Sequence, residues 1–121
     1  MIIAGFGFRR SASVASLGQA LRGVTKGQID GLATVTDKAD TDVFRGFAAG
    51  LGLPVFAVAP QDLSVQQTRT QSQASQAARQ TGSVAEAAAL AAAGPGARLI
   101  APRVISSDGQ ATCALAEGDG T

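Results

Sequence analysis

The sequence predicts an α/β protein: a three-layer α/β/α arrangement on a mainly parallel sheet of about five strands, with a C-terminal antiparallel hairpin. Short apolar runs that suit strands alternate with helical patterns through the first half of the chain, and the links between them are short. Near the other end, Asp108-Gly109 stands between two apolar runs, which is a typical hairpin signal. The length of 121 residues suits a single domain over residues 1–121.

A buried strand is expected at the start of the chain. Residues 2–4 are apolar and include two isoleucines, and the run ends at Gly5 and Gly7, where a backbone or a ligand can approach closely. The two glycines resemble the opening of a dinucleotide-binding fingerprint. However, Arg10 occupies the place of the third glycine, so nucleotide binding is not indicated.

The first helix is expected over residues 13–22, with Ser11 or Ser13 as its cap and Gly23 at its end. Its apolar face is predicted to contain Val14, Leu17 and Leu21. The first N–H groups of this helix would point outward and favour an anion.

The middle of the chain repeats this pattern. A strand is expected over residues 29–34, followed by a polar loop and by a helix capped by Asp40 or Thr41 and ended by Gly50 and Gly52. A third strand is expected over residues 55–59. Since aromatic residues make up only 4% of the chain, a core of Ala, Val, Leu and Ile is predicted.

Residues 61–80 are rich in Gln, Ser, Thr and Ala, which is typical of a surface segment and compatible with a lid over the strand edge. Ser83 and Glu86 have the spacing of a capping box at the start of an alanine-rich helix that ends near residues 94–96. The hairpin would join residues 97–105 to residues 110–116.

Ligands of parallel sheets bind at the carboxyl ends of the strands, and the chain places cations there. Arg9 and Arg10 follow the first strand, and Lys38 follows the second, near Pro60 and Gln61 after the third. The candidate ligand-binding residues are Arg9, Arg10, Ser11, Thr34, Lys38, Ser83 and Glu86. Paired arginines and a lone lysine in a polar loop are also compatible with an ordinary solvated surface.

Charge and composition exclude several classes of function. The net charge of +1 without a basic block argues against nucleic-acid binding. The absence of histidine removes Ser-His-Asp triads and histidine-based metal sites, so no metal and no cofactor are expected. The single cysteine, Cys113, cannot form an internal disulfide and fits a cytoplasmic location. No apolar run approaches the ~20 residues of a membrane span.

Five blocks of sequence occur in an order that resembles the CobE family, which is similar to the C-terminal domain of CbiG, the cobalt-precorrin hydrolase of cobalamin biosynthesis. The blocks are GFGFRRSAS (5–13), LAT with DKAD (32–34 and 37–40), LGLP (51–54), GSVAEAAAL (82–90) and TCALA (112–116). The resemblance implies a compact α/β domain that acts in corrin-ring assembly, in the stand-alone CobE-like form.

The resemblance leaves alternatives for what the domain does. In CbiG-like proteins the full enzyme opens a lactone and releases a two-carbon fragment. This chain would either bind a corrin or precorrin intermediate through the arginines and the lysine at its strand ends, or act as a hydrolase in which Glu86 activates a water. A third alternative is an accessory partner of another cobalamin-pathway enzyme.

Overall fold

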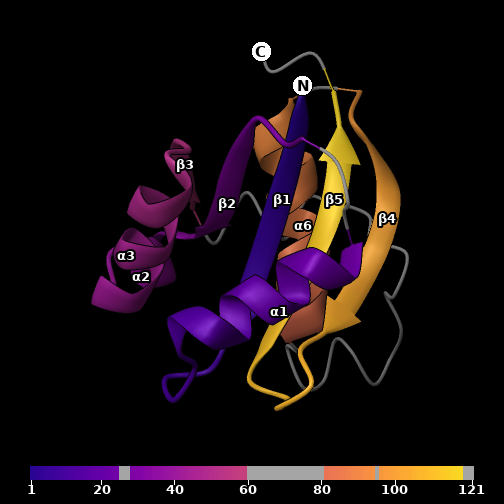
Figure 1. Ribbon diagram of the computed structural model, residues 1–121. Helices are drawn as coiled ribbons and strands as arrows, with labels where there is room; N and C mark the ends of the chain where they lie inside the picture. Colours follow the sequence, from indigo (N-terminus) through magenta and orange to yellow (C-terminus); the bar gives the residue numbers. More distant parts are fainter. Residues whose placement is uncertain (25–27, 60–80, 95, 119–121) are drawn as a thin grey trace.

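A five-stranded sheet forms the middle layer, with the strand order β3-β2-β1-β5-β4 (Figure 1). The strands are β1 (Ile2–Phe8), β2 (Gly31–Val35), β3 (Val55–Val58), β4 (Arg98–Ile105) and β5 (Ala111–Glu117). β1, β2 and β3 are parallel, whereas β5 runs antiparallel to both β1 and β4. This computed structural model describes residues 1–24, 28–59, 81–94 and 96–118, and it confirms the predicted mixed sheet with its hairpin.

Helices cover both faces of the sheet (Figure 1). The helices are α1 (Val14–Val24), α2 (Thr36–Ala39), α3 (Asp42–Leu51) and α6 (Thr81–Ala93). α1 and α3 pack on one face, whereas α6 packs on the other face along β1 and β5. The predicted three-layer arrangement is therefore confirmed.

The core between the sheet and α3 is aromatic, whereas the low aromatic content of the chain predicted a core of Ala, Val, Leu and Ile. The Phe6 ring meets the rings of Phe44 and Phe47 edge-on, with centroids 5.6 Å and 5.4 Å away. The Phe8 ring stacks on Phe44 at 5.6 Å. All four side chains are buried. The prediction was wrong because it counted aromatic residues over the whole chain, whereas the fold gathers four of the five phenylalanines into one cluster.

Small residues let α6 lie directly on the other face of the sheet. A Cβ atom placed on Gly5 of β1 would lie 2.1 Å from the carbonyl oxygen of Ala85 and 2.5 Å from the backbone nitrogen of Ala89. Such contacts are far shorter than van der Waals distances. Gly5 therefore sets the close approach of α6 to β1, as the glycine-rich first strand suggested.

The start of α1 is held by two serines in a reciprocal capping box. The Ser13 hydroxyl accepts a hydrogen bond from the Ser16 backbone N–H at 3.2 Å, and the Ser16 hydroxyl accepts one from the Ser13 N–H at 3.1 Å. Ser13 is thus the cap, one of the two residues predicted. The predicted apolar face needs a correction, since Val14 is 47% exposed while Ser16, Leu17 and Ala20 are buried.

The middle elements agree with the sequence in type and differ in their bounds. Thr41 caps α3 by accepting the Phe44 N–H at 3.4 Å, and Gly52 ends the helix with a left-handed φ of 69°. The polar stretch after β2 was predicted as a loop, but it forms the short helix α2. β2 itself begins at Gly31 rather than at residue 29.

Two further expectations concern the segment before α6. The helix begins at Thr81, so Ser83 lies within its first turn and is not the N-cap. The predicted lid over residues 61–80 lies outside the described residues, as do Pro60 and Gln61.

Candidate functional site

The carboxyl ends of β1 and β2 share one end of the molecule with the β4–β5 turn and the start of α1 (Figure 1). Phe8, the last residue of β1, pairs with Ala111, the first residue of β5. The Arg9 N–H then donates to the Gln110 carbonyl at 2.9 Å. The turn between the hairpin strands therefore flanks the segment that carries Arg9, Arg10 and Ser11.

Arg9 and Arg10 present their guanidinium groups to solvent. Both residues are exposed, and neither makes an ion pair with another residue that the structure describes. The two ion pairs found there join Arg45 to Asp40 and Arg98 to Glu117, far along the chain from this segment. The donor forks of Arg9 and Arg10 are thus available to a carboxylate or phosphate.

Lys38 lies beside the end of β1. Its Nζ atom is 5.2 Å from the centroid of the Phe8 ring, which is a cation–π distance. Its backbone carbonyl accepts the Thr41 hydroxyl at 2.7 Å. The structure therefore brings Lys38 to the residue that precedes Arg9, as expected of neighbouring parallel strands. The aromatic contact itself was not predicted.

Thr34 and Ser11 use their hydroxyl protons within the protein. Thr34 is fully buried, and its hydroxyl donates to the Phe6 carbonyl at 2.9 Å, which links β2 to β1. The exposed Ser11 hydroxyl donates to Oε1 of Gln110. Of the two, only Ser11 lies at the molecular surface beside the arginines.

Glu86 lies on α6 and is fully buried. Its Oε2 atom accepts the backbone N–H of Arg103 at 3.1 Å. This N–H lies in an irregular part of β4, where the register with β5 shifts between Ala101 and Val104 around Pro102. The carboxylate thus satisfies a backbone donor of a strand bulge. The side chain of Ser83 lies outside the described part of the chain.

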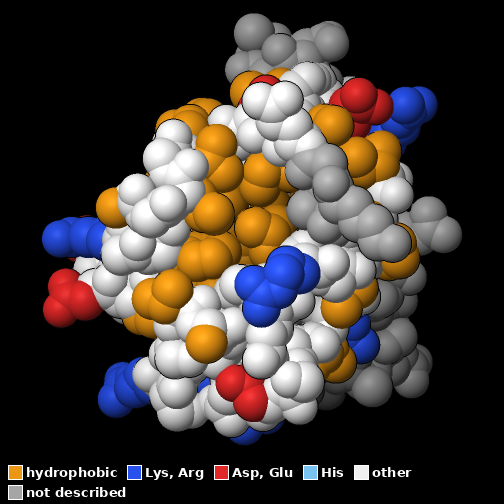
Figure 2. Space-filling model, in the orientation of Figure 1, with side chains coloured by type: hydrophobic (Ala, Val, Ile, Leu, Met, Phe, Trp, Pro, Cys, Tyr) orange, Lys and Arg blue, Asp and Glu red, His pale blue; other side chains and the backbone are white. Residues whose placement is uncertain are grey.

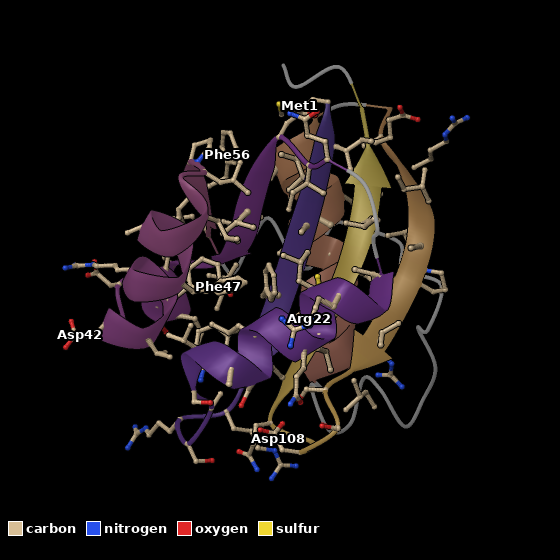
Figure 3. All side chains as sticks on the ribbon, viewed as in Figure 1. Met1, Arg22, Asp42, Phe47, Phe56 and Asp108 are labelled. Atoms are coloured by element: carbon tan, nitrogen blue, oxygen red, sulfur yellow. The ribbon has the colours of Figure 1, made fainter. Side chains whose placement is uncertain are left out.

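Asp108 ties the hairpin to α1, a role that the sequence did not reveal. Its Oδ2 atom accepts the Ser16 hydroxyl at 2.6 Å, while Oδ1 accepts the Ser106 hydroxyl and, at 3.1 Å, the Gln110 N–H. These hydrogen bonds, led by that of Ser106, lower the pKa of the Asp108 carboxyl. The start of α1, expected to attract an external anion, therefore already has a carboxylate of the chain beside it (Figure 3).

The lowered pKa of Asp108 predicts an acid-dependent loss of stability. The contribution is complete above the unfolded-state pKa of about 3.9 and is lost as the pH falls through the lower folded-state pKa. Asp108→Asn is expected to flatten the fall in urea-unfolding free energy below about pH 4. Asp42→Asn is the control, because the exposed Asp42 projects from α3 away from the hairpin (Figure 3). An unchanged acid slope in Asp108→Asn would contradict the assignment.

The rest of the described surface offers weaker candidates for a ligand-binding site. An open, polar depression of about 340 Å³ lies at the opposite end of the sheet, lined by Met1, Gly96, Arg98, Glu117 and Gly118. Its side-chain charges are already joined in the ion pair of Arg98 with Glu117. No group of three or more potential metal-ligating acids or cysteines is found among the residues described, and no helix among them could cross a membrane. Basic side chains form separate spots on the face shown in Figure 2.

Comparison with known proteins decides the family. The family model described as "Cobalamin synthesis G C-terminus" matches residues 2–116. The chain belongs to this family. The resemblance drawn from the five sequence blocks is thus confirmed, and the family is one of cobalamin biosynthesis proteins.

Solved structures agree with this membership of the cobalamin synthesis G C-terminal family. The chain is 36% identical to CobE, a protein from the cobalamin biosynthetic pathway, with a TM-score of 0.78 over 96% of this chain and 89% of CobE. It is 38% identical to the cobalamin biosynthesis protein chiG from Agrobacterium tumefaciens, with a TM-score of 0.72 over 98% of each chain.

A more distant structure shares the fold alone. A cobalamin biosynthesis protein G homologue from Sulfolobus solfataricus is 18% identical, with a TM-score of 0.69 over 95% of this chain and 36% of that protein. The comparison with curated proteins finds no match.

Proposed function

We propose that this single domain binds a corrin or precorrin intermediate of cobalamin biosynthesis at the carboxyl end of β1. The observation that supports the proposal is the gathering of Arg9, Arg10 and Lys38 there, with no ion pair to any described acid. We call these three residues the cationic edge. Membership of the cobalamin biosynthesis family selects the class of ligand.

The chemistry of such a ligand suits the cationic edge. Corrin precursors carry acetate and propionate carboxylates around a flat apolar macrocycle. A guanidinium binds a carboxylate through two parallel hydrogen bonds, whereas an ammonium acts as a point charge. Arg9 and Arg10 would clamp side-chain carboxylates, and Lys38 would add a charge beside them.

The described residues favour binding over hydrolysis. The chain has no histidine. The Cys113 thiol is buried, and burial raises its pKa well above the usual value, so it is a poor nucleophile. The Glu86 carboxylate already accepts a backbone N–H. The proposal places the protein in the cytoplasm, with other cobalamin-pathway enzymes as the partners that supply or receive the pigment.

An Arg9→Ala/Arg10→Ala variant is expected to bind a corrin polycarboxylate about thirtyfold more weakly, because each exposed ionic contact contributes about 1 kcal/mol. Cobyrinic acid is a suitable ligand, and its visible absorbance follows the titration. Arg45→Ala/Arg98→Ala is the matched control, since it removes the same charge from two surface ion pairs elsewhere. Binding by the unaltered protein should weaken with salt more steeply than binding by the Arg9/Arg10 variant.

Two results would count against this function. Equal affinities of the Arg9/Arg10 variant and the unaltered protein would move the site away from the cationic edge. A bound precursor whose mass changes during incubation would show catalysis, and the hydrolase alternative would then replace simple binding.

A further inference from the structure

Phe8 has two neighbours that give it a role besides core packing. Its ring stacks on Phe44, with centroids 5.6 Å apart and an interplanar angle of 7°. The ammonium of Lys38 lies over the same ring at 5.2 Å. Phe8 is only 2% exposed, so packing fixes the position of its ring. A ring in a fixed position can hold the ammonium in a fixed position.

The backbone of Lys38 is held as well. Thr41 donates both its hydroxyl, at 2.7 Å, and its N–H, at 3.2 Å, to the Lys38 carbonyl. The same Thr41 hydroxyl caps α3. Lys38 is therefore constrained at both ends of its side chain, by Thr41 at the main chain and by Phe8 at the ammonium.

This double constraint is not explained by an ion pair, because Lys38 makes none with the acids that the structure describes. Free lysine side chains lose rotamer entropy when they bind a ligand, and this loss weakens binding. A lysine that is already held over a ring loses less. The ammonium thus has an ordered position and a charge that no described acid pairs with, next to a chain segment whose two guanidinium groups also make no ion pair with the described residues.

We propose that Phe8 is a positioning residue that holds the Lys38 ammonium in place to bind a carboxylate of the ligand. This inference rests on the proposed function of the cationic edge and deepens it. Phe8 does not touch the ligand in this arrangement. Because Arg9 directly follows Phe8 in the sequence, Phe8 holds Lys38 close to the two arginines. Arg9, Arg10 and Lys38 then form one carboxylate-binding surface.

Phe47 provides a matched control within the same aromatic cluster. It is 5% exposed and contacts Phe6 at 5.4 Å and Phe44 at 6.3 Å, but no cation–π contact joins it to Lys38. Phe8→Leu and Phe47→Leu should both lower the unfolding temperature. Only Phe8→Leu should alter binding through Lys38.

The test is a double-mutant cycle in cobyrinic acid affinity, measured well below the unfolding temperature of each variant. Lys38→Met is expected to weaken binding about fivefold, and Phe8→Leu about threefold, the range of an exposed cation–π contact. With Lys38→Met already present, Phe8→Leu should cost nothing further. Phe47→Leu should leave the affinity unchanged in either background.

A second measurement needs no ligand. Ring current from Phe8 should shift the ε-methylene protons of Lys38 upfield in the unaltered protein and in Phe47→Leu, and this shift should vanish in Phe8→Leu. Absence of the shift in the unaltered protein would overturn the positioning role.

The remaining outcomes separate this inference from the proposed function. If Arg9→Ala/Arg10→Ala weakens binding but Phe8→Leu costs the same with and without Lys38, the positioning role is wrong and the cationic edge stands. If the unaltered protein binds no cobyrinic acid, the proposed function fails and the positioning role fails with it.

Discussion

Gly5→Ala is expected to destabilise the protein by about 3 kcal/mol, the upper range for inserting a methyl group into a packed interior. The new Cβ would lie 2.1 Å from the Ala85 carbonyl oxygen and 2.5 Å from the Ala89 nitrogen. Both are backbone atoms of α6, so no side-chain rotation relieves the clash. The helix must shift away from β1, and its contacts along the sheet must weaken. Urea unfolding followed by circular dichroism measures the loss.

Gly46→Ala and Gly50→Ala are the matched controls. Both glycines lie on exposed parts of α3, and apart from the glycine itself, its chain neighbours and the nearby backbone of α3, a Cβ on either would have no heavy atom within 4 Å. Alanine has a higher helix propensity than glycine, so these variants should gain up to about 1 kcal/mol. Gly→Ala is thus expected to lower the unfolding free energy at position 5 and to raise it at positions 46 and 50. A Gly5→Ala variant as stable as the unaltered protein would show that α6 lies farther from β1 than described.

Local patterns predicted those parts of the fold that local chemistry determines. The Asp108-Gly109 turn forms, and Gly109 has a left-handed φ of 72° that glycine adopts without strain. Thr41, one of the two predicted caps, begins α3, and Gly52 ends it, whereas Gly50, also predicted at the end, lies within the last turn. In each case the residue's own conformational preference or a hydrogen bond within one turn decides the outcome, so the sequence suffices.

Features that depend on distant residues could not be predicted in this way. The buried face of α1 includes Ser16 rather than Val14, and the Ser16 hydroxyl donates to Asp108, which lies 92 residues away in the sequence. The four-phenylalanine cluster likewise joins β1 to α3. The sequence spacing predicts neither the contact of Ser16 with Asp108 nor the phenylalanine cluster.

For the candidate site too, the sequence predicted the features set by local order and topology but not those set by distant contacts. Parallel topology was enough to place Arg9, Arg10 and Lys38 at one end of the sheet. The Ser83 and Glu86 spacing predicted a capping box, but it gave no sign that the Glu86 carboxylate accepts a backbone N–H from the β4 bulge. That interaction depends on the register shift around Pro102, which only the three-dimensional pairing of β4 with β5 reveals.

Phe44→Ala is expected to cost about 3–5 kcal/mol of unfolding free energy, the usual range for removing a buried phenylalanine ring. Phe44 is fully buried and contacts the rings of Phe6, Phe8 and Phe47. Its loss leaves a cavity at the centre of the aromatic cluster. Phe56→Ala is the control, because Phe56 is half-buried on the edge strand β3 and should cost less.

The same substitution should also disturb the cationic edge. Phe8 stacks on Phe44, so a cavity at Phe44 removes the surface that fixes the Phe8 ring. The Lys38 ammonium then no longer has an ordered ring to lie over. At a temperature where Phe44→Ala remains folded, its affinity for cobyrinic acid should fall by about threefold, as in Phe8→Leu. Phe56→Ala should bind normally. If Phe44→Ala kept full affinity while folded, the order of Lys38 would not depend on the aromatic cluster. The proposed effect of Phe44 on the carboxylate site, through Phe8 and Lys38, would then be wrong.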